Sequence, residues 1–512
     1  MSANAPDTVK VTIDGREVEV PKGTLLVEAA KMAGTEIPVF CYHPKLRPAG
    51  VCRMCLVEVE GQRKPLTACT TPVADGMVVK TGSPTVQSLQ RGVLELLLLN
   101  HPLDCPICDK GGECDLQDLT YGWGPATSRL ADPKLRRNKA VDLGPYIVFD
   151  EERCILCRRC VRFDDEIAQE RTLVVEERAH MATIATPEGV PYDSYFGGNT
   201  IDLCPVGALT SRLYRFKARP WDLTRVPSIC TGCSVGCNVE LHFRHGTLMR
   251  VVPRENRAIN DAWICDRGRF NYQYLYDERV ERPLVRRGDR LVPVPWGEAI
   301  AEAARRLRHI VQEKGPKAVG FIGGGRLTNE EAYLFQKLAR TVIQTPHIDH
   351  RVGAQTVASL GEFPGRIADI DRAQVILVVD ALPAEVAPIL DLRVRGAAAR
   401  GARLVSIGAA LPEYRVPAEA LAVRPGETAQ AVEGLAEALR SGEEEPTVPL
   451  LGERGSAVVH ALRQASSVAV IWDGVSPAVG RALAALAGAL GKETAVHLFV
   501  PGEQTNSRGA EA

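Results

Sequence analysis

The sequence predicts a multidomain protein in which small α+β modules are followed by an α/β region. The chain has 512 residues, more than a single hydrophobic core usually serves. All 15 cysteines lie between Cys41 and Cys265, which marks the first half as chemically distinct. From about Glu281 onward cysteine is absent, and apolar runs alternate with amphipathic helical patterns, as is typical of α/β folds.

Charge and hydropathy argue against several classes of partner. The 62 basic and 63 acidic residues give a net charge of -1, so no electrostatic footprint indicates nucleic acid or an anionic membrane. Residues Met1 to Thr8 lack the apolar core of a secretory signal. The most apolar stretch, Val93 to Leu99, is far shorter than the ~20 residues that cross a bilayer. We therefore expect a soluble, cytoplasmic chain with no direct membrane insertion.

Residues 1–82 predict a small β-grasp domain. An alternating pattern from Val9 to Val20 is interrupted by Asp14-Gly15, a dipeptide that favours a tight hairpin turn. A helical stretch and two further strands follow, at Thr24 to Ala33, Leu56 to Glu60 and Met77 to Thr81. This order of elements is typical of a β-grasp ferredoxin domain.

The cysteines of this first module form set 1: Cys41, Cys52, Cys55 and Cys69. Four thiolates meet the requirement of a [2Fe–2S] cluster. Ten residues separate the first two ligands, unlike the plant-type spacing, so the β-grasp context carries the assignment. A zinc ribbon built on Cys52 and Cys55 is the alternative.

Residues 83–145 predict a second module, in which a Leu-rich helix from Thr85 to Asn100 leads into a loop rich in Cys and Gly. Its three cysteines are one ligand short of a four-ligand site, and His101 is the expected completion because imidazole replaces thiolate at some iron sites. An oxygen from Asp104, Asp109 or Asp115, or a purely capping histidine, is the alternative. Set 2, a [4Fe–4S] site, is therefore His101, Cys105, Cys108 and Cys114.

Residues 146–219 predict a [4Fe–4S] ferredoxin-like domain that opens with a strand from Tyr146 to Asp150. Three cysteines at C-x2-C-x2-C spacing can bind three irons of one cubane, and the Cys-Pro dipeptide at Cys204 supplies the fourth ligand. Set 3 is Cys154, Cys157, Cys160 and Cys204. Nearby basic side chains either offset cluster charge or are solvated loop charges: Arg158, Arg159, Arg162 and Arg267.

Residues 220–278 predict a fourth module with one further [4Fe–4S] site. Set 4 is Cys230, Cys233, Cys237 and Cys265. Fifteen cysteines and His101 supply the sixteen donors that one [2Fe–2S] and three [4Fe–4S] clusters need, so no thiol is left over. The odd number of cysteines and the missing signal sequence argue against a disulfide framework. We expect electron conduction and no catalytic residue in this chain.

Residues 279–512 predict a single α/β region. Four apolar runs read as buried parallel strands, most of them followed by a helical pattern, at Ala318 to Ile322, Gln374 to Asp380, Arg403 to Ile407 and Ser467 to Ile471. The segment from Gly442 to Pro449 is expected to be a surface linker within this region.

The order of the four sets, with the spacing His101-x3-Cys105-x2-Cys108-x5-Cys114, resembles the family of large iron–sulfur subunits, the G subunits, of bacterial NADH:quinone oxidoreductase, respiratory complex I. The resemblance covers the whole chain. The histidine-containing motif is specific to this family, to the iron-only hydrogenases and to some formate dehydrogenases. The stretch from Trp263 to Phe270 resembles the cluster-binding start of the molybdopterin oxidoreductase fold, and the α/β region resembles the next part of that fold.

The same resemblance implies that no molybdopterin is bound. Asn506 to Ala510 resembles a motif about midway through longer family members, so the later pterin-binding domains are expected to be missing. No cysteine after Cys265 is present to ligate molybdenum. The glycine-rich turn at Phe321 to Arg326, before a helix capped near Thr328, could cradle a phosphate, but such a motif alone is weak and a plain tight turn is expected.

The resemblance further implies a place in an electron pathway. Electrons would pass from a flavin- and NADH-binding subunit through sets 1, 2 and 3 towards a ferredoxin-like subunit and quinone, coupled in the complex to proton translocation. Set 4 would lie off this path. The expected partners are the other peripheral-arm subunits, including a [2Fe–2S] subunit, with the chain peripheral on the cytoplasmic side of the inner membrane.

Three other functions remain as alternatives. An NAD-linked formate dehydrogenase alpha-type subunit predicts a longer chain with a metal-ligating Cys or selenocysteine beyond set 4, by family analogy. An iron-only hydrogenase needs further cysteines in its C-terminal half, and the sequence has none there. A zinc-bound scaffold without redox function predicts a colourless protein.

Overall fold

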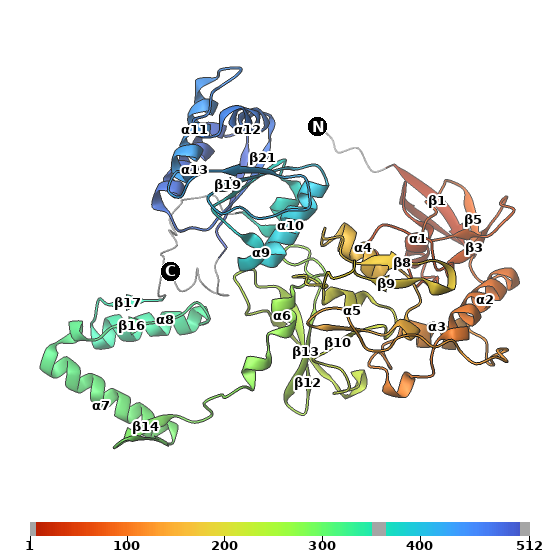
Figure 1. Cartoon of the computed structure of the whole chain (residues 1–512), viewed down its shortest axis with the longest axis horizontal. Helices are drawn as coiled ribbons and strands as arrows, with labels where there is room; N and C mark the ends of the chain where they lie inside the picture. Colours follow the sequence, from red (N-terminus) through yellow and green to blue (C-terminus); the bar gives the residue numbers. More distant parts are fainter. Residues whose placement is uncertain (1–6, 351–364, 502–512) are drawn as a thin grey trace. The chain divides into compact units, whose positions relative to one another are not determined.

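A computed structural model describes residues 7–350 and 365–501. These divide into two compact units, one formed by residues up to Val226 together with His242–Arg250, the other by Pro227–Leu241 and the chain from Val251 onward. Each unit is described by itself (Figure 1). Within the described ranges, no helix combines the length and the apolarity needed to cross a membrane.

The first unit opens with the expected β-grasp domain. A five-stranded sheet has the order β2-β1-β5-β3-β4, and Asp14 and Gly15 both adopt positive φ in the β1–β2 hairpin, as its turn requires. Helix α1 packs on a core of alternating strand residues such as Val11 and Ile13. The elements are β1 (Thr8–Ile13), β2 (Arg16–Pro21), α1 (Leu26–Met32), β3 (Leu56–Val59), β4 (Leu66–Thr67) and β5 (Met77–Lys80).

The second module consists of helix α2 (Pro84–Asn100), a 3-10 turn at Cys105–Ile107 and helix α3 (Asp115–Trp123). Ser83 caps α2, since its hydroxyl accepts a hydrogen bond from the N–H of Val86 at 3.2 Å. The Leu-rich face of α2 is partly internal: Leu94 is fully buried, Leu97, Leu98 and Leu99 are half-buried, and Leu96 is 70% exposed. The helix therefore ends with His101 at its C-cap, beside the cysteine loop.

The rest of the first unit is built from short elements around a shared core. The three-stranded sheet β10-β7-β6 carries the buried Ile147 and Phe149 of β7. A second, two-stranded sheet pairs β8 with β9. The elements are β6 (Val141–Asp142), β7 (Ile147–Phe149), α4 (Arg159–Glu166), β8 (Val174–Glu176), β9 (Thr183–Ala185), α5 (Asn199–Leu203) and β10 (Leu209–Ser211), with 3-10 turns at Glu151–Arg153, Ala179–Met181 and Pro220–Asp222.

The segment that follows forms a three-stranded sheet in the order β11-β12-β13. Asn260 fixes the loop after this sheet, because its side-chain oxygen accepts from the N–H of Asn238 and its amide donates to the carbonyl of Trp263. The elements are β11 (Thr224–Ile229), β12 (Asn238–Arg244), β13 (Thr247–Pro253), α6 (Asp266–Phe270) and a 3-10 turn at Gln273–Leu275.

A five-stranded parallel sheet, in the order β20-β19-β18-β21-β22, forms the core of the α/β region (Figure 1, cyan to blue). Alternate residues such as Leu377, Ile407 and Val470 pack against α11, α12 and α13 in one apolar cluster. The elements are β18 (Val375–Val379), α9 (Pro383–Val386), α10 (Pro388–Ala399), β19 (Arg403–Gly408), β20 (Glu419–Ala422), α11 (Thr428–Ser441), α12 (Gly452–Gln464), β21 (Ser467–Trp472), α13 (Pro477–Leu490) and β22 (Ala495–Phe499).

The structure corrects one predicted strand. Ala318 to Ile322 was expected to be buried in this sheet, but only Phe321 and Ile322 are extended, and they pair with β17 in a separate two-stranded sheet. Ile322 is 68% exposed, so apolar composition alone misled the prediction. The elements here are β14 (Leu284–Arg287), β15 (Arg290–Pro293), α7 (Trp296–Lys314), β16 (Phe321–Ile322), α8 (Asn329–Lys337), a π-helical turn at Leu338–Ile343 and β17 (Ile348–Asp349).

Three other expectations for the α/β region are confirmed. The predicted strands at residues 374–380, 403–407 and 467–471 are β18, β19 and β21. The expected surface linker contains no helix or strand and is mostly exposed. The predicted helix cap is a reciprocal pair, in which the hydroxyl of Thr328 accepts from the N–H of Glu331 and the Glu331 carboxylate accepts from the N–H of Thr328. The motif at residues 506–510 lies outside the described residues.

Candidate iron–sulfur cluster sites

The structure brings the four cysteines of set 1 together. Three lie on the loop between α1 and β3, and Cys69 follows β4. The side chain of Cys41 hydrogen-bonds to those of Cys52 and Cys69, and the side chain of Cys55 hydrogen-bonds to that of Cys69. All are buried except the half-buried Cys52. The loop between α1 and β3 and the end of β4 thus bring the four sulfur atoms together.

Hydrogen bonds within set 1 favour thiolate at Cys41 and Cys55, whereas the same bonds raise the pKa of their partners Cys52 and Cys69. Hydrogen bonds from Cys52 and then Cys69 lower the pKa of Cys41, and a hydrogen bond from Cys69 lowers the pKa of Cys55. The backbone N–H of Cys41 lies 3.4 Å from the Sγ of Cys52. Backbone N–H donors around sulfur are a feature that tunes iron–sulfur centres, and the thiolate is the form of cysteine that ligates metal.

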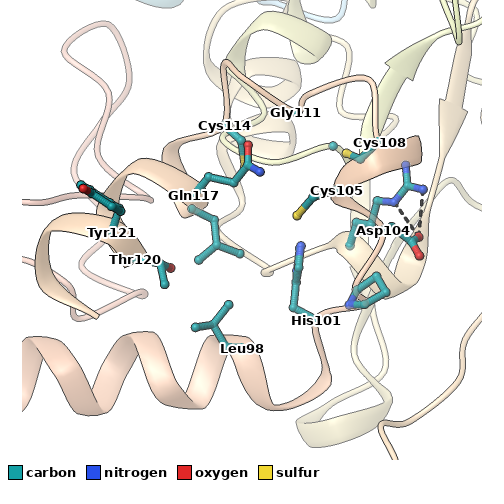
Figure 2. Close-up of a pocket in the computed structure, with 14 residues that line it drawn as sticks. Leu98, His101, Asp104, Cys105, Cys108, Gly111, Cys114, Gln117, Thr120 and Tyr121 are labelled. Carbon is teal, nitrogen blue, oxygen red and sulfur yellow. Dashed lines mark hydrogen bonds and ion pairs between the residues drawn. The ribbon is translucent and has the colours of Figure 1, made fainter. Parts of the chain in front are cut away.

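All four donors of set 2 border one cavity of about 320 Å³ in the first unit. Figure 2 shows the imidazole of His101 reaching towards the thiol of Cys105, in a space bordered by Leu98 and Thr120. Most of the remaining wall is apolar or small. Because a nitrogen and three sulfurs face one largely apolar space, the donor chemistry fits an iron–sulfur cluster with one histidine ligand.

His101 is held in the form that can ligate a metal. Burial, with the nearby charges of Arg153 and Lys134, lowers its pKa to about 4, so the ring is neutral at neutral pH. No hydrogen bond to either ring nitrogen is present among the described residues. A neutral imidazole with an available nitrogen is what metal ligation requires.

The three aspartates that could have replaced His101 are otherwise engaged. Asp104 contacts Arg153 at 2.9 Å and Lys139 at 2.6 Å. Asp109 accepts a hydrogen bond from the N–H of Phe216 at 2.7 Å through Oδ1, and its Oδ2 has no hydrogen-bond partner among the described residues, but Asp109 does not line the set 2 cavity. Asp115 forms an ion pair with Arg159 at 3.5 Å. These contacts favour His101 as the fourth donor of set 2.

Glycines shape the wall of the set 2 cavity. A Cβ atom on Gly207 would lie 2.1 Å from the Sγ of Cys108, which is impossible without moving one of them. A Cβ atom on Gly111 would lie 3.0 Å from the carbonyl oxygen of Cys105. The loop can therefore wrap tightly around its contents only with glycine at these positions.

Set 3 is also largely buried, with Cys157, Cys160 and Cys204 each 8% exposed. Its ligand loop turns through Leu156 and Arg158, which both have positive φ, and the N–H of Leu156 lies 3.4 Å from the Sγ of Cys154. Burial raises the pKa of Cys160 well above its ordinary value, and the other three thiols of the set raise it further because they repel a second negative charge. All four thiols are therefore close neighbours.

Set 4 lies within the second unit. Burial raises the pKa of Cys265 to about 12, and Cys230 and Cys233 add to this effect. A Cβ atom on Gly268 would lie 3.0 Å from the Sγ of Cys230 and 3.7 Å from the Sγ of Cys265. The structure therefore brings the distant Cys265 to the C-x2-C-x3-C loop, as the sequence predicts.

Within the described part of the chain, no group of three or more His, Cys, Asp or Glu side chains meets the geometry of a metal-ion site. In set 2 the four donors instead border a largely apolar cavity, and in set 1 the four thiols contact one another. Thiolate-rich donors, N–H groups directed at sulfur and glycine walls together fit iron–sulfur clusters.

Sequence reasoning missed two features of these sites and left a third open. Gly207 was not singled out, although it follows the Cys204-Pro205 dipeptide closely enough to have been suspected. Arg153 lines the set 2 cavity and is only 3% exposed. Arg159 was expected to be solvated or charge-offsetting with equal weight, and it is 8% exposed. Burial of these arginines depends on contacts distant in sequence, which no local pattern reveals.

Five sequence-family profiles match consecutive parts of the chain. They are a 2Fe-2S iron-sulfur cluster binding domain (residues 6–84), the NADH-ubiquinone oxidoreductase-G iron-sulfur binding region (90–129), the NADH-quinone oxidoreductase subunit 3 ferredoxin-like domain (144–210), the molybdopterin oxidoreductase Fe4S4 domain (223–277) and molybdopterin oxidoreductase (279–447). Domains that bind 2Fe–2S and 4Fe–4S clusters are therefore present, in the order that the sequence predicts.

Curated relatives resemble most of the chain. The NADH-quinone oxidoreductase G subunit of Streptomyces coelicolor is 40% identical over 94% of this chain, and that of Mycobacterium bovis is 43% identical over 77%. The NADPH-Fe(3+) oxidoreductase subunit alpha of Geobacter sulfurreducens is 40% identical over 78%. The matches span 58%, 50% and 48% of these relatives, respectively.

One solved structure, a crystal structure of NAD+-reducing [NiFe]-hydrogenase in the H2-reduced state, is 31% identical over 41% of this chain and 90% of its own, with a TM-score of 0.37. The order of the matched domains and the identity to the two NADH-quinone oxidoreductase relatives agree with the donor sets described above. The chain belongs to the family of NADH-quinone oxidoreductase G subunits.

Proposed function

We propose that the chain is the iron–sulfur subunit that conducts electrons within an NADH:quinone oxidoreductase. When bound, iron–sulfur clusters accept and donate single electrons. Here the protein supplies the ligands and buries the sites away from solvent. Set 1 would hold one [2Fe–2S] cluster and sets 2, 3 and 4 one [4Fe–4S] cluster each. The proposed ligands are Cys41, Cys52, Cys55, Cys69; His101, Cys105, Cys108, Cys114; Cys154, Cys157, Cys160, Cys204; and Cys230, Cys233, Cys237, Cys265.

The observation that carries this proposal is the direct linkage of three sets within the first unit. The N–H of Asp115, next to Cys114, donates to the carbonyl of Pro205, next to Cys204, at 3.1 Å. Arg162, on the helix that begins at set 3, donates to the carbonyl of Cys41. These direct hydrogen bonds between the ligand loops support electron transfer among the three sets.

The remaining roles follow from family membership. The electron donor would be a flavin- and NADH-binding subunit, and the acceptor a ferredoxin-like subunit that leads to quinone, with a [2Fe–2S] subunit also present. Proton translocation would belong to the whole complex, peripheral on the cytoplasmic side of the inner membrane. This chain itself would hold no substrate site and no catalytic residue.

Set 4 is proposed to lie off this path and to stabilise the start of the α/β region. Arg267, two residues after Cys265, donates to the carbonyls of Glu385 and Val386 at 2.9 and 2.7 Å. These bonds tie the set 4 loop to the segment before α10. No molybdopterin is proposed, because no cysteine follows Cys265.

The test is anaerobic purification of the tagged chain with its partners from the source organism. EPR signals of sets 1, 2 and 3 should appear on addition of NADH and disappear on addition of quinone. Signals that dithionite elicits but NADH does not would contradict the proposed place in the pathway, whereas absence of all signals would contradict the cluster assignment.

A second candidate is favoured by one relative. The NADPH-Fe(3+) oxidoreductase subunit alpha matches this chain at 40% identity, the same value as the Streptomyces coelicolor relative. An NADPH-linked oxidoreductase that delivers electrons to a soluble acceptor would show the same EPR signals with NADPH in place of NADH and no response to quinone. None of the three relatives is named a formate dehydrogenase, so that alternative is not favoured.

A further inference from the structure

Arg159 is a buried cation in the first unit. It lies between the set 3 residues Cys157 and Cys160, at the first position of α4, and is 8% exposed. One terminal nitrogen, Nη2, donates to the carbonyl of Tyr42 at 2.7 Å. The other, Nη1, donates to the carbonyl of Leu203 at 3.3 Å and lies 3.5 Å from Oδ2 of Asp115.

Each of these three partners is the chain neighbour of a different proposed ligand set. Tyr42 follows Cys41 of set 1, and Asp115 follows Cys114 of set 2. Leu203 precedes Cys204 of set 3. One guanidinium therefore contacts the ligand loops of all three sets at once, through contacts up to 117 residues apart in sequence.

The chemistry of arginine suits this position. Its guanidinium remains charged at any physiological pH, and its planar fork can serve several acceptors simultaneously. The Nε of Arg159 is buried with no hydrogen-bond partner among the described residues, so one donor remains for a sulfur acceptor. A buried charge acts over longer distances than an exposed one, because water and salt do not screen it.

We propose that Arg159 is a positioning residue that sets the reduction potentials of sets 1, 2 and 3 together. The inference rests on the cluster assignment proposed above. Each cluster gains one negative charge on reduction, and a shared positive charge stabilises that reduced state at all three sites. Hydrogen bonds and local charge are known determinants of cluster potential, and here one side chain supplies both to three sites.

Arg158 offers a matched control. It carries the same charge, precedes Arg159 directly, and lies in the same set 3 loop, but it is exposed. Its charge is therefore screened by solvent. If proximity in sequence to set 3 were enough to set the cluster potentials, replacing either arginine would shift them equally. If the buried position matters, only replacement of Arg159 shifts sets 1 and 2.

The experiment compares the wild-type chain with Arg159→Gln, Arg159→Lys and Arg158→Gln, purified anaerobically and titrated potentiometrically with EPR detection of each cluster. Iron and acid-labile sulfide are measured first. Arg159→Gln should lower the ratio of reduced to oxidised set 3 about tenfold at fixed potential, equivalent to 59 mV for a one-electron couple. Sets 1 and 2 should shift in the same direction by less.

Arg159→Lys keeps the charge but loses the planar fork, so it should shift all three potentials by clearly less than Arg159→Gln, while Arg158→Gln should leave sets 1 and 2 unchanged. If Arg159→Gln keeps its full iron content and the potentials of sets 1 and 2 do not shift, the inference about Arg159 is overturned but the proposed function is not. The same holds if the potentials in Arg159→Lys shift as far as in Arg159→Gln. A wild-type chain without iron overturns the proposed function, and this inference with it.

Where Arg159→Gln loses iron, Asp115→Asn decides the question. Removal of this carboxylate leaves the guanidinium without its anionic partner. Asp115 adjoins set 2, and Arg159 connects it to Tyr42, the neighbour of Cys41 in set 1. A rise in the potential of the [2Fe–2S] cluster of set 1 supports the inference, and an unchanged value overturns it.

Discussion

Gly207 is the residue that most tightly limits the set 2 cavity. Because a Cβ atom there would lie 2.1 Å from the Sγ of Cys108, we expect Gly207→Ala to displace that ligand and to abolish the set 2 cluster, with a loss of about four iron per chain. Gly122→Ala is the control, since a Cβ on Gly122 meets nothing within 4 Å. Iron analysis with EPR checks both, and a fully loaded Gly207→Ala protein would contradict the geometry.

His101 is predicted to be a ligand and not only a helix cap. We expect His101→Ala to lose the set 2 cluster, whereas His101→Cys should retain it with a lower midpoint potential, because thiolate adds negative charge where imidazole does not. Asp104→Asn should keep the cluster, since Asp104 is engaged with Arg153 and Lys139. Potentiometric EPR distinguishes these outcomes, and the opposite pattern would make Asp104 the ligand.

In the α/β region, helix α10 buries the carboxylate of Asp391. The free energy of folding that this burial costs depends on pH. Asp391 is fully buried, with Arg395 Nε 2.6 Å from its Oδ2, and burial raises its pKa above the ordinary 3.8 despite this arginine. Asp391 therefore binds its proton more tightly in the folded state than in the unfolded state. The resulting stability is present below the ordinary pKa and is lost as pH rises through the raised value.

We expect this loss to disappear in Asp391→Asn, which does not titrate. The measurement is hydrogen-exchange protection of β18 from pH 4 to pH 7, compared between the wild type and the variant. Glu433→Gln, an exposed carboxylate on α11, should retain the wild-type slope. If the protection of β18 in Asp391→Asn still fell with pH as steeply as in the wild type, the effect would belong to another titrating group.

At the scale of elements, the sequence correctly predicted the turns and helix starts that a few neighbouring side chains determine. Asp14-Gly15 indicated its hairpin because both residues must adopt positive φ, and Thr328 with Glu331 indicated a helix start through a reciprocal cap. The four donor sets were readable because cluster ligation fixes cysteine spacing. Ala318 to Ile322 failed because an apolar run does not reveal which sheet it joins. Gly207 and Arg159 act through contacts that only the fold creates.

At the scale of the whole molecule, sets 1 to 3 belong to one compact unit and set 4 to the other. We expect Cys265→Ser to lose about four iron while NADH still reduces sets 1, 2 and 3 in the assembled complex. The reason is that set 4 lies outside the unit that links the other three. EPR after addition of NADH checks this, and loss of reduction at all sets would place set 4 on the path.

The central claim is that this chain holds four iron–sulfur clusters and no other metal. The most direct measurement is elemental analysis, with acid-labile sulfide, of the anaerobically purified chain. The account predicts roughly 14 iron and 14 sulfide per chain, from one [2Fe–2S] and three [4Fe–4S] clusters, without molybdenum or tungsten. Zinc in place of iron would contradict the electron-conducting function, and stoichiometric molybdenum or tungsten would indicate an enzyme of the formate dehydrogenase type.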